Sequence, residues 1–494
     1  MDFMQKPNVI LIIADQWRGD CLGAAGHPDV KTPYFDTLCS GGIRFPNAVS
    51  ATPTCIPARA ALYTGMAQEN HRRVGYRDGV RWDYPRTLAG TFAENGYQCH
   101  CAGKLHVHPL RNSVGYHSVD LHDGYLHYYR RPEVPYYDNQ RVADDYHHWL
   151  KNELGIEADP TETGIDCNSW VARPWMYPEK YHPTRWVTDR AIDFLRKRDR
   201  DKPFFLTLSY VRPHPPFDAP QAFFDMYRNK SLRPPLHGDW TDEKWLERDG
   251  RIFDSGTGPS DPDLQTAAQI GYYAAITQID YEFGRFWEAM FSHGLDRSNT
   301  VLLFVSDHGE MLCDHGLFRK SLPYKGSAGI PFIVSAPRRC LEAAGCTVPA
   351  DSRLRERVVE LRDVMPTLLA LCGLDIPETV DGQNVFAPDW NRDYIHGEHL
   401  YDGGSCQWIV TERDKFVWFS STGRRQYFDL VRDPDEMHNA IDDADCAERI
   451  AELENLLIRE LSWREEGFVR NGRLTPGVPV RAVLEHSRRE TVQT

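Results

Sequence analysis

At 494 residues, the chain is long enough for one large domain with a smaller one beside it. Its 41% hydrophobic, 26% charged and 12% aromatic residues make a globular composition, which excludes a disordered or collagen-like chain. The formal net charge of -14 argues against general binding to nucleic acid or to an anionic membrane. An anionic substrate would therefore need local cations.

The first apolar stretch, residues 9–14, is too short for a signal peptide and follows no basic segment. No later stretch approaches the roughly 18 apolar residues that a membrane span requires. The twelve cysteines form no CxxC pair and no small-scaffold spacing, which indicates reduced thiols. We therefore expect a cytoplasmic protein.

Apolar runs and helix-length segments alternate along most of the chain. Near-continuous apolar runs predict strands buried on both faces at residues 8–15, 96–103, 202–211 and 299–307. Helices are predicted at residues 87–95, 186–196, about 264–293 and 362–374. This alternation predicts an α/β fold with a mostly parallel sheet between helices. Because the carboxyl ends of parallel strands meet at one edge, we expect Asp15 and Asp307 to lie together there.

The chain changes character after this region. Residues 385–465 carry short β-type runs joined by turn residues and then a helix at about 447–463, which predicts a small α+β unit. The last thirty residues have weak periodicity and are expected to pack as a tail on this chain or on a neighbour. We expect a catalytic domain at residues 1–384 and a small C-terminal α+β domain with its tail at residues 385–494, and the tail leaves a homo-oligomer open.

The segment TPTCIPARAALYTG, residues 52–65, places a cysteine at a helix start. Pro57 suits the first turn of a helix, and Gly65 ends it. Cys55 therefore lies where free N–H groups and the helix dipole attract an anion, with Arg59 one turn further on. From these residues alone, a buried thiol beside a surface arginine stays open. A tyrosine-phosphatase-type loop fits poorly, because it places five residues between cysteine and arginine.

The segment CIPARAALYTG resembles the signature of the sulfatase family, a CxP(S/A)R core followed by a leucine and a TG ending. The family is the formylglycine-dependent type I sulfatases of the alkaline phosphatase superfamily, so the resemblance implies an alkaline-phosphatase-like fold. It also implies that a maturation enzyme oxidises Cys55 to formylglycine. The hydrated aldehyde would attack the sulfur with one hydroxyl, and the other would expel sulfate as the aldehyde reforms.

The resemblance also implies a divalent metal ion. The family's metal positions correspond here to Asp15, Gln16, Asp307 and His308, together with residue 55. Gln16 departs from the commonest pair of aspartates, and His308 introduces a nitrogen ligand. The family favours Ca²⁺, while Mn²⁺ or another divalent ion stays open. Either aspartate alone could be an ordinary loop or cap residue.

Three further segments resemble family elements that follow predicted strands. In GKLH, Lys104 and His106 would bind the sulfuryl oxygens, and a zinc site made by His106 and His108 is the weaker alternative. In HPPF, His214 would bind the ester and help the leaving oxygen depart, and a packed loop histidine is the alternative.

The third segment, RKSLPYKGSAGIP, puts Lys320 in the family's catalytic lysine position, with Tyr324, Ser327 and Pro331 in register. Lys325 falls where the family often has glutamate, as a surface lysine or a substrate contact.

These elements predict an enzyme that hydrolyses a sulfate monoester of a sugar, a glycan fragment or an alkyl or aryl alcohol. The closest rival is a phosphonate monoester hydrolase or phosphodiesterase of the same superfamily. Its substrate has two free oxygens on phosphorus and needs fewer donors, so Lys104 and His106 favour sulfate. A non-catalytic binding protein on this fold is disfavoured, because neither the nucleophile nor a metal acid is lost.

The alcohol half of the substrate is less clear from the sequence. Glu398 and His399 are candidates for sugar contacts, and strand-end residues in a domain seam are an equal alternative. Arg72 and the aromatic-rich residues 123–137 are weaker candidates.

Overall fold

The computed structural model describes residues 6–125, 143–247, 250–346 and 356–492. Within these ranges, a seven-stranded sheet has the order β2-β8-β7-β1-β6-β4-β5. The adjacent strands β7, β1, β6, β4 and β5 pair in parallel, and β8 pairs antiparallel with both of its neighbours, β7 and β2. The predicted mostly parallel sheet is thus confirmed. The strands are β1 (Asn8–Asp15), β2 (Ile43–Arg44), β4 (Gln98–Gly103), β5 (Ser118–Leu121), β6 (Phe204–Pro213), β7 (Thr300–Ser306) and β8 (Phe332–Ser335).

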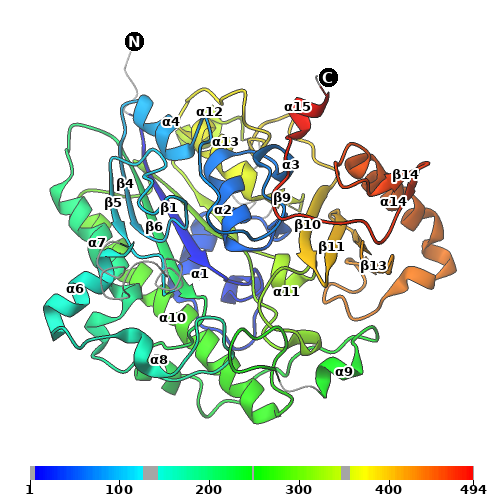
Figure 1. Ribbon diagram of the computed structural model, residues 1–494. Coiled ribbons are helices and arrows are strands. Elements are labelled where there is room, and N and C mark those ends of the chain that lie inside the picture. The colour runs from blue at the N-terminus through cyan, green and yellow to red at the C-terminus, as the bar shows by residue number, and fades with distance from the viewer. Residues whose placement is uncertain (1–5, 126–142, 248–249, 347–355, 493–494) are drawn as a thin grey trace.

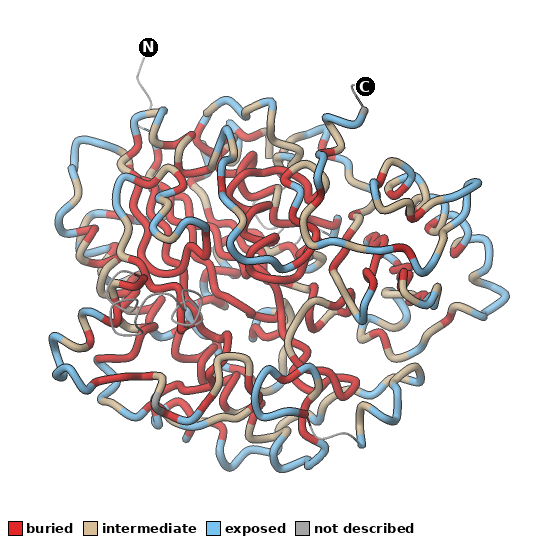
Figure 2. Tube along the Cα trace, in the orientation of Figure 1, coloured by how far each residue is buried: buried red, intermediate tan, exposed pale blue. Residues whose placement is uncertain are grey.

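Helices cover both faces of this sheet, because side chains along each strand alternate between two cores. Ile10 and Ile12 of β1 face the first core, and Leu11 and Ile13 face the second. Figure 2 shows the buried residues concentrated along these strands and the helices that flank them. The first core is covered by α1 (Pro33–Gly41), α6 (Asp145–Leu154), α7 (Pro183–Lys197), α8 (Gln221–Asp225) and α10 (Pro262–Ser292). The second is covered by α2 (Cys55–Thr64), α4 (Leu88–Glu94), α12 (Arg338–Ala343) and α13 (Val364–Leu371).

The register of the central strands brings two acidic residues to the same edge of the sheet. Ala14 of β1 pairs with Ser306 of β7, so the next residues, Asp15 and Asp307, leave the sheet at the same edge. This is the arrangement predicted from the two apolar runs.

A second sheet lies beside the first (Figure 1). Its four described strands are antiparallel in the order β10 (Ile395–Tyr401), β11 (Gly404–Val410), β12 (Asp414–Phe419) and β13 (Arg425–Asp429). One face, with Trp408 and Val417, packs on the large domain, and the other, with Trp418, packs on α14 (Ala447–Leu461). The small C-terminal α+β unit is thus present, and residue 385 stays our proposed boundary.

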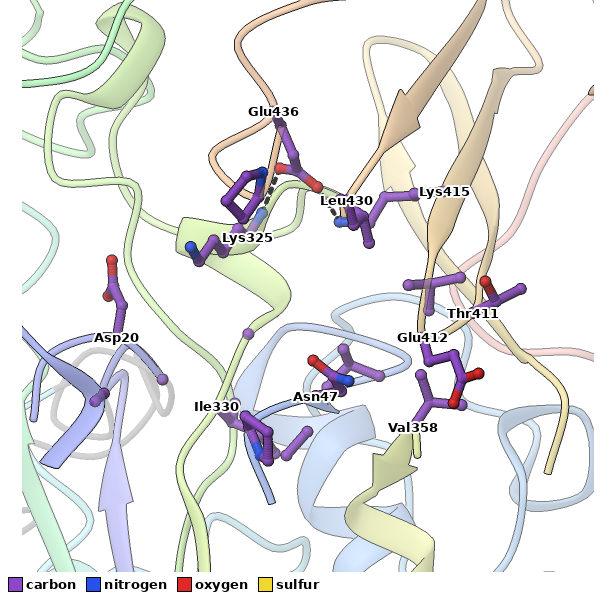
Figure 3. Close-up of a pocket in the computed structure, with 18 of the residues that line it drawn as sticks. Asp20, Asn47, Lys325, Ile330, Val358, Thr411, Glu412, Lys415, Leu430 and Glu436 are labelled. Atoms are coloured by element: carbon purple, nitrogen blue, oxygen red, sulfur yellow. Dashed lines mark hydrogen bonds and ion pairs between the residues drawn. The ribbon is translucent and has the colours of Figure 1, made fainter. Parts of the chain in front are cut away.

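The seam between the two sheets contains a buried ion pair. Glu436 accepts hydrogen bonds from the Lys415 ammonium and, at 2.7 Å, from the backbone N–H of Lys325 (Figure 3). The Lys325 ammonium pairs with Asp435 at 2.8 Å beside a cavity of about 300 Å³. Lys325 therefore belongs to the seam.

The C-terminal tail packs on this chain as far as residue 492. Backbone hydrogen bonds join Val74 to Ala482 at 3.0 Å and Leu484 to Arg72 at 2.9 Å. The tail ends in α15 (Arg488–Val492), next to α3 (Gln68–His71). Arg72 donates to the Glu485 carbonyl at 3.0 Å, so the tail occupies this candidate substrate contact.

The remaining strands and α-helices of the described chain are short. They are β3 (Ala48–Val49), paired with β9 (Val359–Glu360), β14 (Val469–Arg470), paired with β15 (Arg473–Leu474), α9 (Glu243–Leu246) and α11 (Lys325–Ala328). Among the described helices, none combines the length and apolarity needed to cross a bilayer. All twelve cysteines lie within the described residues as free thiols.

Candidate active site

Helix α2 presents Cys55 at its first position. Thr54 precedes it in an extended conformation, and Gly65 ends the helix with a φ of 67° that favours glycine. All ten residues of α2 are buried, so the helix passes through the core. The positive end of its dipole therefore points at a site shielded from water.

Four potential ligand atoms surround one point at the carboxyl edge of the sheet. Asp15, Cys55, Asp307 and His308 each offer an atom within 4.8 Å of the others, and all four residues are buried. The Cys55 Sγ lies 3.6 Å from both Asp15 carboxylate oxygens and 3.3 Å from His308 Nε2. Four of the five residues predicted to hold a metal thus lie together, and the fifth, Gln16, follows Asp15 directly.

The chemistry of this donor set fits a divalent cation. The Nδ1–H of His308 donates to the Gly309 carbonyl at 3.0 Å, which leaves Nε2 facing the site. Burial lowers the pKa of His308 to about 4, so the ring is neutral and can act as a ligand. The carboxylates of Asp15 and Asp307, the imidazole of His308 and the amide oxygen of Gln16 are ligand types that suit Ca²⁺, Mn²⁺ or a similar ion.

Gln16 links this cluster to two further side chains. Its Nε2 donates to the Glu310 carboxylate, and its Oε1 accepts from the Lys320 ammonium. The Lys320 Nζ also lies 3.8 Å from the Cys55 Sγ. Since Glu310 also accepts from the Leu312 backbone N–H at 2.9 Å, its carboxylate fixes which end of the Gln16 amide faces the site.

Arg59 and Lys104 place two buried cations against the carboxylates. Arg59 Nε donates to Asp307 at 2.9 Å, and the Lys104 ammonium donates to Asp15. Three other contacts hold the Arg59 guanidinium, namely the Lys104 carbonyl at 2.9 Å, Ser209 Oγ at 3.0 Å and the Tyr63 hydroxyl at 3.1 Å.

These charges set the protonation of the site. Burial acts to raise the pKa of Asp15, but the nearby Lys104 and other cations outweigh it and hold this pKa well below the ordinary value. Burial, reinforced by the Asp15 charge, raises the pKa of the Cys55 thiol. A thiolate nucleophile is therefore disfavoured here.

His214 approaches the cluster from the loop after β6. Its backbone N–H donates to the Asp15 carbonyl at 3.0 Å, and its Nδ1–H donates to the Pro215 carbonyl at 2.8 Å. Its Nε2 is thus left for a ligand. Burial, and next the charge of Lys320, lower the pKa of His214 well below its ordinary value.

His106 lies on a neighbouring wall. Its backbone N–H donates to Asp123 at 2.9 Å, and its ring meets the Tyr76 ring edge-on, with 6.2 Å between centroids. Its Nε2 is 4.0 Å from the Asp78 carboxylate. The alternative zinc site gains no support, because the metal-ligand cluster found among the described residues does not include His106 or His108.

Strand β10 brings the small domain to the nucleophile loop. The Glu398 backbone N–H donates to the Ala51 carbonyl at 2.8 Å, and His399 Nε2 lies 2.9 Å from the Thr54 hydroxyl. The Glu398 carboxylate is buried against Arg464 at 2.8 Å, which leaves it no open face toward a substrate. Glu398 as a sugar contact is thus wrong, because the ion pair uses its carboxylate.

Sequence reasoning missed Tyr63, Ser209 and Glu310. Glu310 had a local signal, an acid three residues after the strand-end Asp307. Tyr63 and Ser209 had none, because only the folded chain brings them to Arg59. Of the aromatic-rich segment 123–137, residues 126–137 lie outside the described residues.

Known proteins resemble this chain over nearly its whole length. A family model described as Sulfatase matches residues 7–374, and one described as N-sulphoglucosamine sulphohydrolase, C-terminal, matches residues 313–462. An arylsulfatase of Clostridium perfringens is 45% identical over 488 residues, which is 98% of this chain and 100% of that protein.

Two solved structures have the same fold. The phosphonate monoester hydrolase of Agrobacterium radiobacter has a TM-score of 0.73 and 27% identity, and the match covers 93% of this chain and 98% of that chain. A structure described as in complex with its substrate D-glucosamine-2-N,6-O-disulfate has a TM-score of 0.70 and 18% identity, over 93% and 98% of the two chains.

Proposed function

The chain belongs to the sulfatase family of enzymes, which hydrolyse sulfate esters, and we propose that it does so with Cys55 converted to formylglycine and a divalent cation beside it. Asp15, Gln16, Asp307 and His308 would hold the cation together with residue 55. The formylglycine hydrate supplies a hydroxyl nucleophile, and the cation supplies positive charge to the sulfuryl oxygens. The buried donor set around the Cys55 Sγ carries this proposal.

The side chains of this chain would bind and orient the sulfuryl group. Its charge spreads over three non-bridging oxygens, and donors aimed at them act strongly because the site excludes water. Arg59, Lys104, His106 and Lys320 are the proposed donors, and removal of one would raise the barrier by about 2.7 to 4 kcal/mol. Three of these donors are held in place before substrate binds, Arg59 by Asp307, Lys104 by Asp15 and Lys320 by the Gln16 amide.

His214 would serve the leaving oxygen. Its Nδ1–H is held by the Pro215 carbonyl, so Nε2 is the atom that would face the departing oxygen, and it delivers a proton there only after the ring has taken one up. The Lys320 ammonium, 3.8 Å from the Cys55 Sγ, would offset the charge that develops on that oxygen.

The structural likeness to a phosphonate monoester hydrolase favours one second candidate, hydrolysis of a phosphonate monoester or phosphodiester. Lys104 and His106 argue for sulfate, because a third non-bridging oxygen needs additional donors. The 45% identical arylsulfatase supports the same choice.

The test is the ratio of kcat/KM for 4-nitrophenyl sulfate and 4-nitrophenyl phenylphosphonate, with protein produced alongside a formylglycine-generating enzyme and the Cys55→Ala variant as blank. We expect sulfate to be favoured. A ratio that favours the phosphonate would replace the sulfatase proposal by the second candidate. Turnover of neither, on protein whose Cys55 is converted, would contradict both for aryl substrates.

We also propose the cytoplasm as the working compartment and a formylglycine-generating enzyme as a partner. The twelve free thiols support a reducing compartment. The sulfate ester itself would be a small molecule or a sulfated sugar, as for the protein bound to a glucosamine disulfate.

A further inference from the structure

A cavity of about 720 Å³ adjoins the site on the side of Lys320. Lys320 lines this cavity, while its ammonium lies 3.8 Å from the Cys55 Sγ. Two other connections tie the cavity walls to the nucleophile loop. The Ser321 backbone N–H donates to the Pro53 carbonyl at 3.0 Å, and β10 runs from His399, next to Thr54, to Tyr401 in the wall.

The position and size of this cavity suit the alcohol half of a substrate. Lys320 both lines the cavity and lies beside the nucleophile, so a leaving oxygen that pairs with its ammonium would point toward the cavity. The volume is within the range of pockets that hold small organic ligands, about 300–1,000 Å³. The Tyr401 and Phe419 rings, 5.6 Å apart between centroids, supply an aromatic wall.

Most of the charged side chains in the wall already have a structural role. Asp242 accepts from the Lys244 backbone N–H at the start of α9, and Arg319 pairs with Asp254. Asp402 is the first residue of the two-residue Asp-Gly turn between β10 and β11, where its φ of 46° and that of Gly403, 72°, are the values this tight hairpin turn needs. Structural contacts therefore account for the side chains of Asp242 and Arg319, and the backbone turn accounts for Asp402.

The guanidinium of Arg424 differs from these side chains in its lack of an ion-pair partner among the described residues. Arg424 is exposed, and no carboxylate of the described residues lies within ion-pair distance of it. Its guanidinium stacks over the Phe419 ring, 4.2 Å from the centroid, and a backbone hydrogen bond of 2.9 Å between these residues closes the turn. A guanidinium fixed by its face offers the N–H groups at its edge, which match the two oxygens of a carboxylate.

We propose that this cavity binds the alcohol half of the sulfate ester and that Arg424 selects alcohols bearing a carboxylate, as in a uronic acid. This inference rests on the proposed sulfatase activity. It makes Arg424 a specificity residue contributed by the small domain, from the turn between β12 and β13. The catalytic groups would contact only the sulfate group, which all these esters share. Arg424 would contact the alcohol part and so determine which esters are hydrolysed fastest.

The experiment uses matched aryl sulfates that differ only at the far end. Biphenyl-4-yl sulfate is compared with its 4′-carboxylate, 4′-carboxamide and 4′-sulfonate derivatives on the converted enzyme. We expect kcat/KM for the carboxylate to exceed that for the carboxamide by about tenfold. Arg424→Gln should abolish this preference and Arg424→Glu should reverse it. The adjacent Arg425→Gln is the matched control, because Arg425 pairs with Glu454 at 3.0 Å and does not line the cavity.

Equal kcat/KM values for carboxylate and carboxamide in the parent enzyme would overturn the proposal, as would a preference that survives Arg424→Gln. Stronger preference for the sulfonate would overturn the carboxylate assignment in favour of a second sulfate group. Failure to hydrolyse even unsubstituted biphenyl-4-yl sulfate would contradict the proposed function instead. In that case, calorimetric binding of 4′-hydroxybiphenyl-4-carboxylate against its carboxamide tests the Arg424 site without turnover.

Discussion

At the scale of single residues, the site depends on side chains whose orientation other side chains fix. The Gln16 amide has two chemically different ends, and only its oxygen can ligate a cation or accept from Lys320. Glu310, as a carboxylate that also accepts two backbone N–H groups, can receive only the nitrogen end. Glu310 is therefore a positioning residue for the proposed metal site.

Glu310→Gln should weaken the affinity for Mn²⁺ or Ca²⁺ by about 10- to 100-fold. The new amide keeps its oxygen on the Leu312 and Arg319 N–H groups and presents its nitrogen to Gln16, which must then turn its own nitrogen toward the site. Calorimetric titration of chelator-treated protein measures the affinity. An unchanged affinity would refute this role, and an unchanged melting temperature of the metal-free variant is the control for folding.

At the scale of elements, the edge strand β10 connects the small sheet to the nucleophile loop. Its backbone contacts Ala51, and the side chain of His399 contacts Thr54, next to Cys55. The Nδ1–H of His399 donates to the Leu400 carbonyl at 2.8 Å, so its Nε2 accepts from the Thr54 hydroxyl. The strand is held in turn by the buried pair of Glu398 and Arg464, whose side chains are each 1% exposed.

Arg464→Met should lower the free energy of unfolding by about 3–5 kcal/mol, because it leaves the Glu398 carboxylate buried without its cation. Urea unfolding measures the change. The matched control is Arg338→Met, which removes a pair with Glu342 whose side chains are 88% and 60% exposed. That control should cost less than about 1 kcal/mol, and similar losses in the two variants would contradict the importance of the buried pair.

At the scale of the whole molecule, two sheets are joined at a seam that borders the catalytic edge. The large sheet supplies the strand-end acids, and the small sheet supplies β10 and the turn that carries Arg424 (Figure 1). The long helix α10 packs against α1 and α7 and carries a buried acid, Asp280, that accepts from the Phe35 backbone N–H at 2.8 Å. This carboxyl makes global stability depend on pH.

Burial raises the pKa of Asp280 to about 7 in the folded protein, above its value in the unfolded chain. Between these two values the folded state binds more protons, so this group's contribution to stability is present at low pH and is lost as pH rises through about 7. Asp280→Asn cannot ionise and keeps one oxygen to accept from the Phe35 N–H, while its NH2 group replaces the oxygen that accepts from the Tyr34 N–H, a loss that is the same at every pH. The free energy of unfolding of the variant minus that of the parent should increase by roughly 2–3 kcal/mol as the pH rises from 5 to 8.

Urea unfolding of both proteins at several pH values measures this difference, in which the titration of all other groups cancels. Parallel stability curves would show that Asp280 does not titrate as described.

Local pattern was sufficient to predict the main strands, the long helices and the meeting of Asp15 with Asp307, because buried parallel strands are continuous apolar runs. It could not predict that β8 runs antiparallel, since nothing in its four residues records direction. The pair of Glu398 and Arg464, 66 residues apart, and the contact of Gln16 with Glu310, 294 residues apart, arise only when the chain folds. The resemblance to the family supplied the candidate catalytic residues, and the geometry supplied their partners.

We propose that Cys55, as formylglycine, is the nucleophile of this sulfatase. The most direct test is the initial rate of 4-nitrophenyl sulfate hydrolysis in preparations that differ in the fraction of Cys55 converted, measured by mass spectrometry of the peptide that contains it. The account predicts a rate proportional to that fraction, with none remaining in unconverted protein. A rate independent of conversion would contradict it and would require another nucleophile.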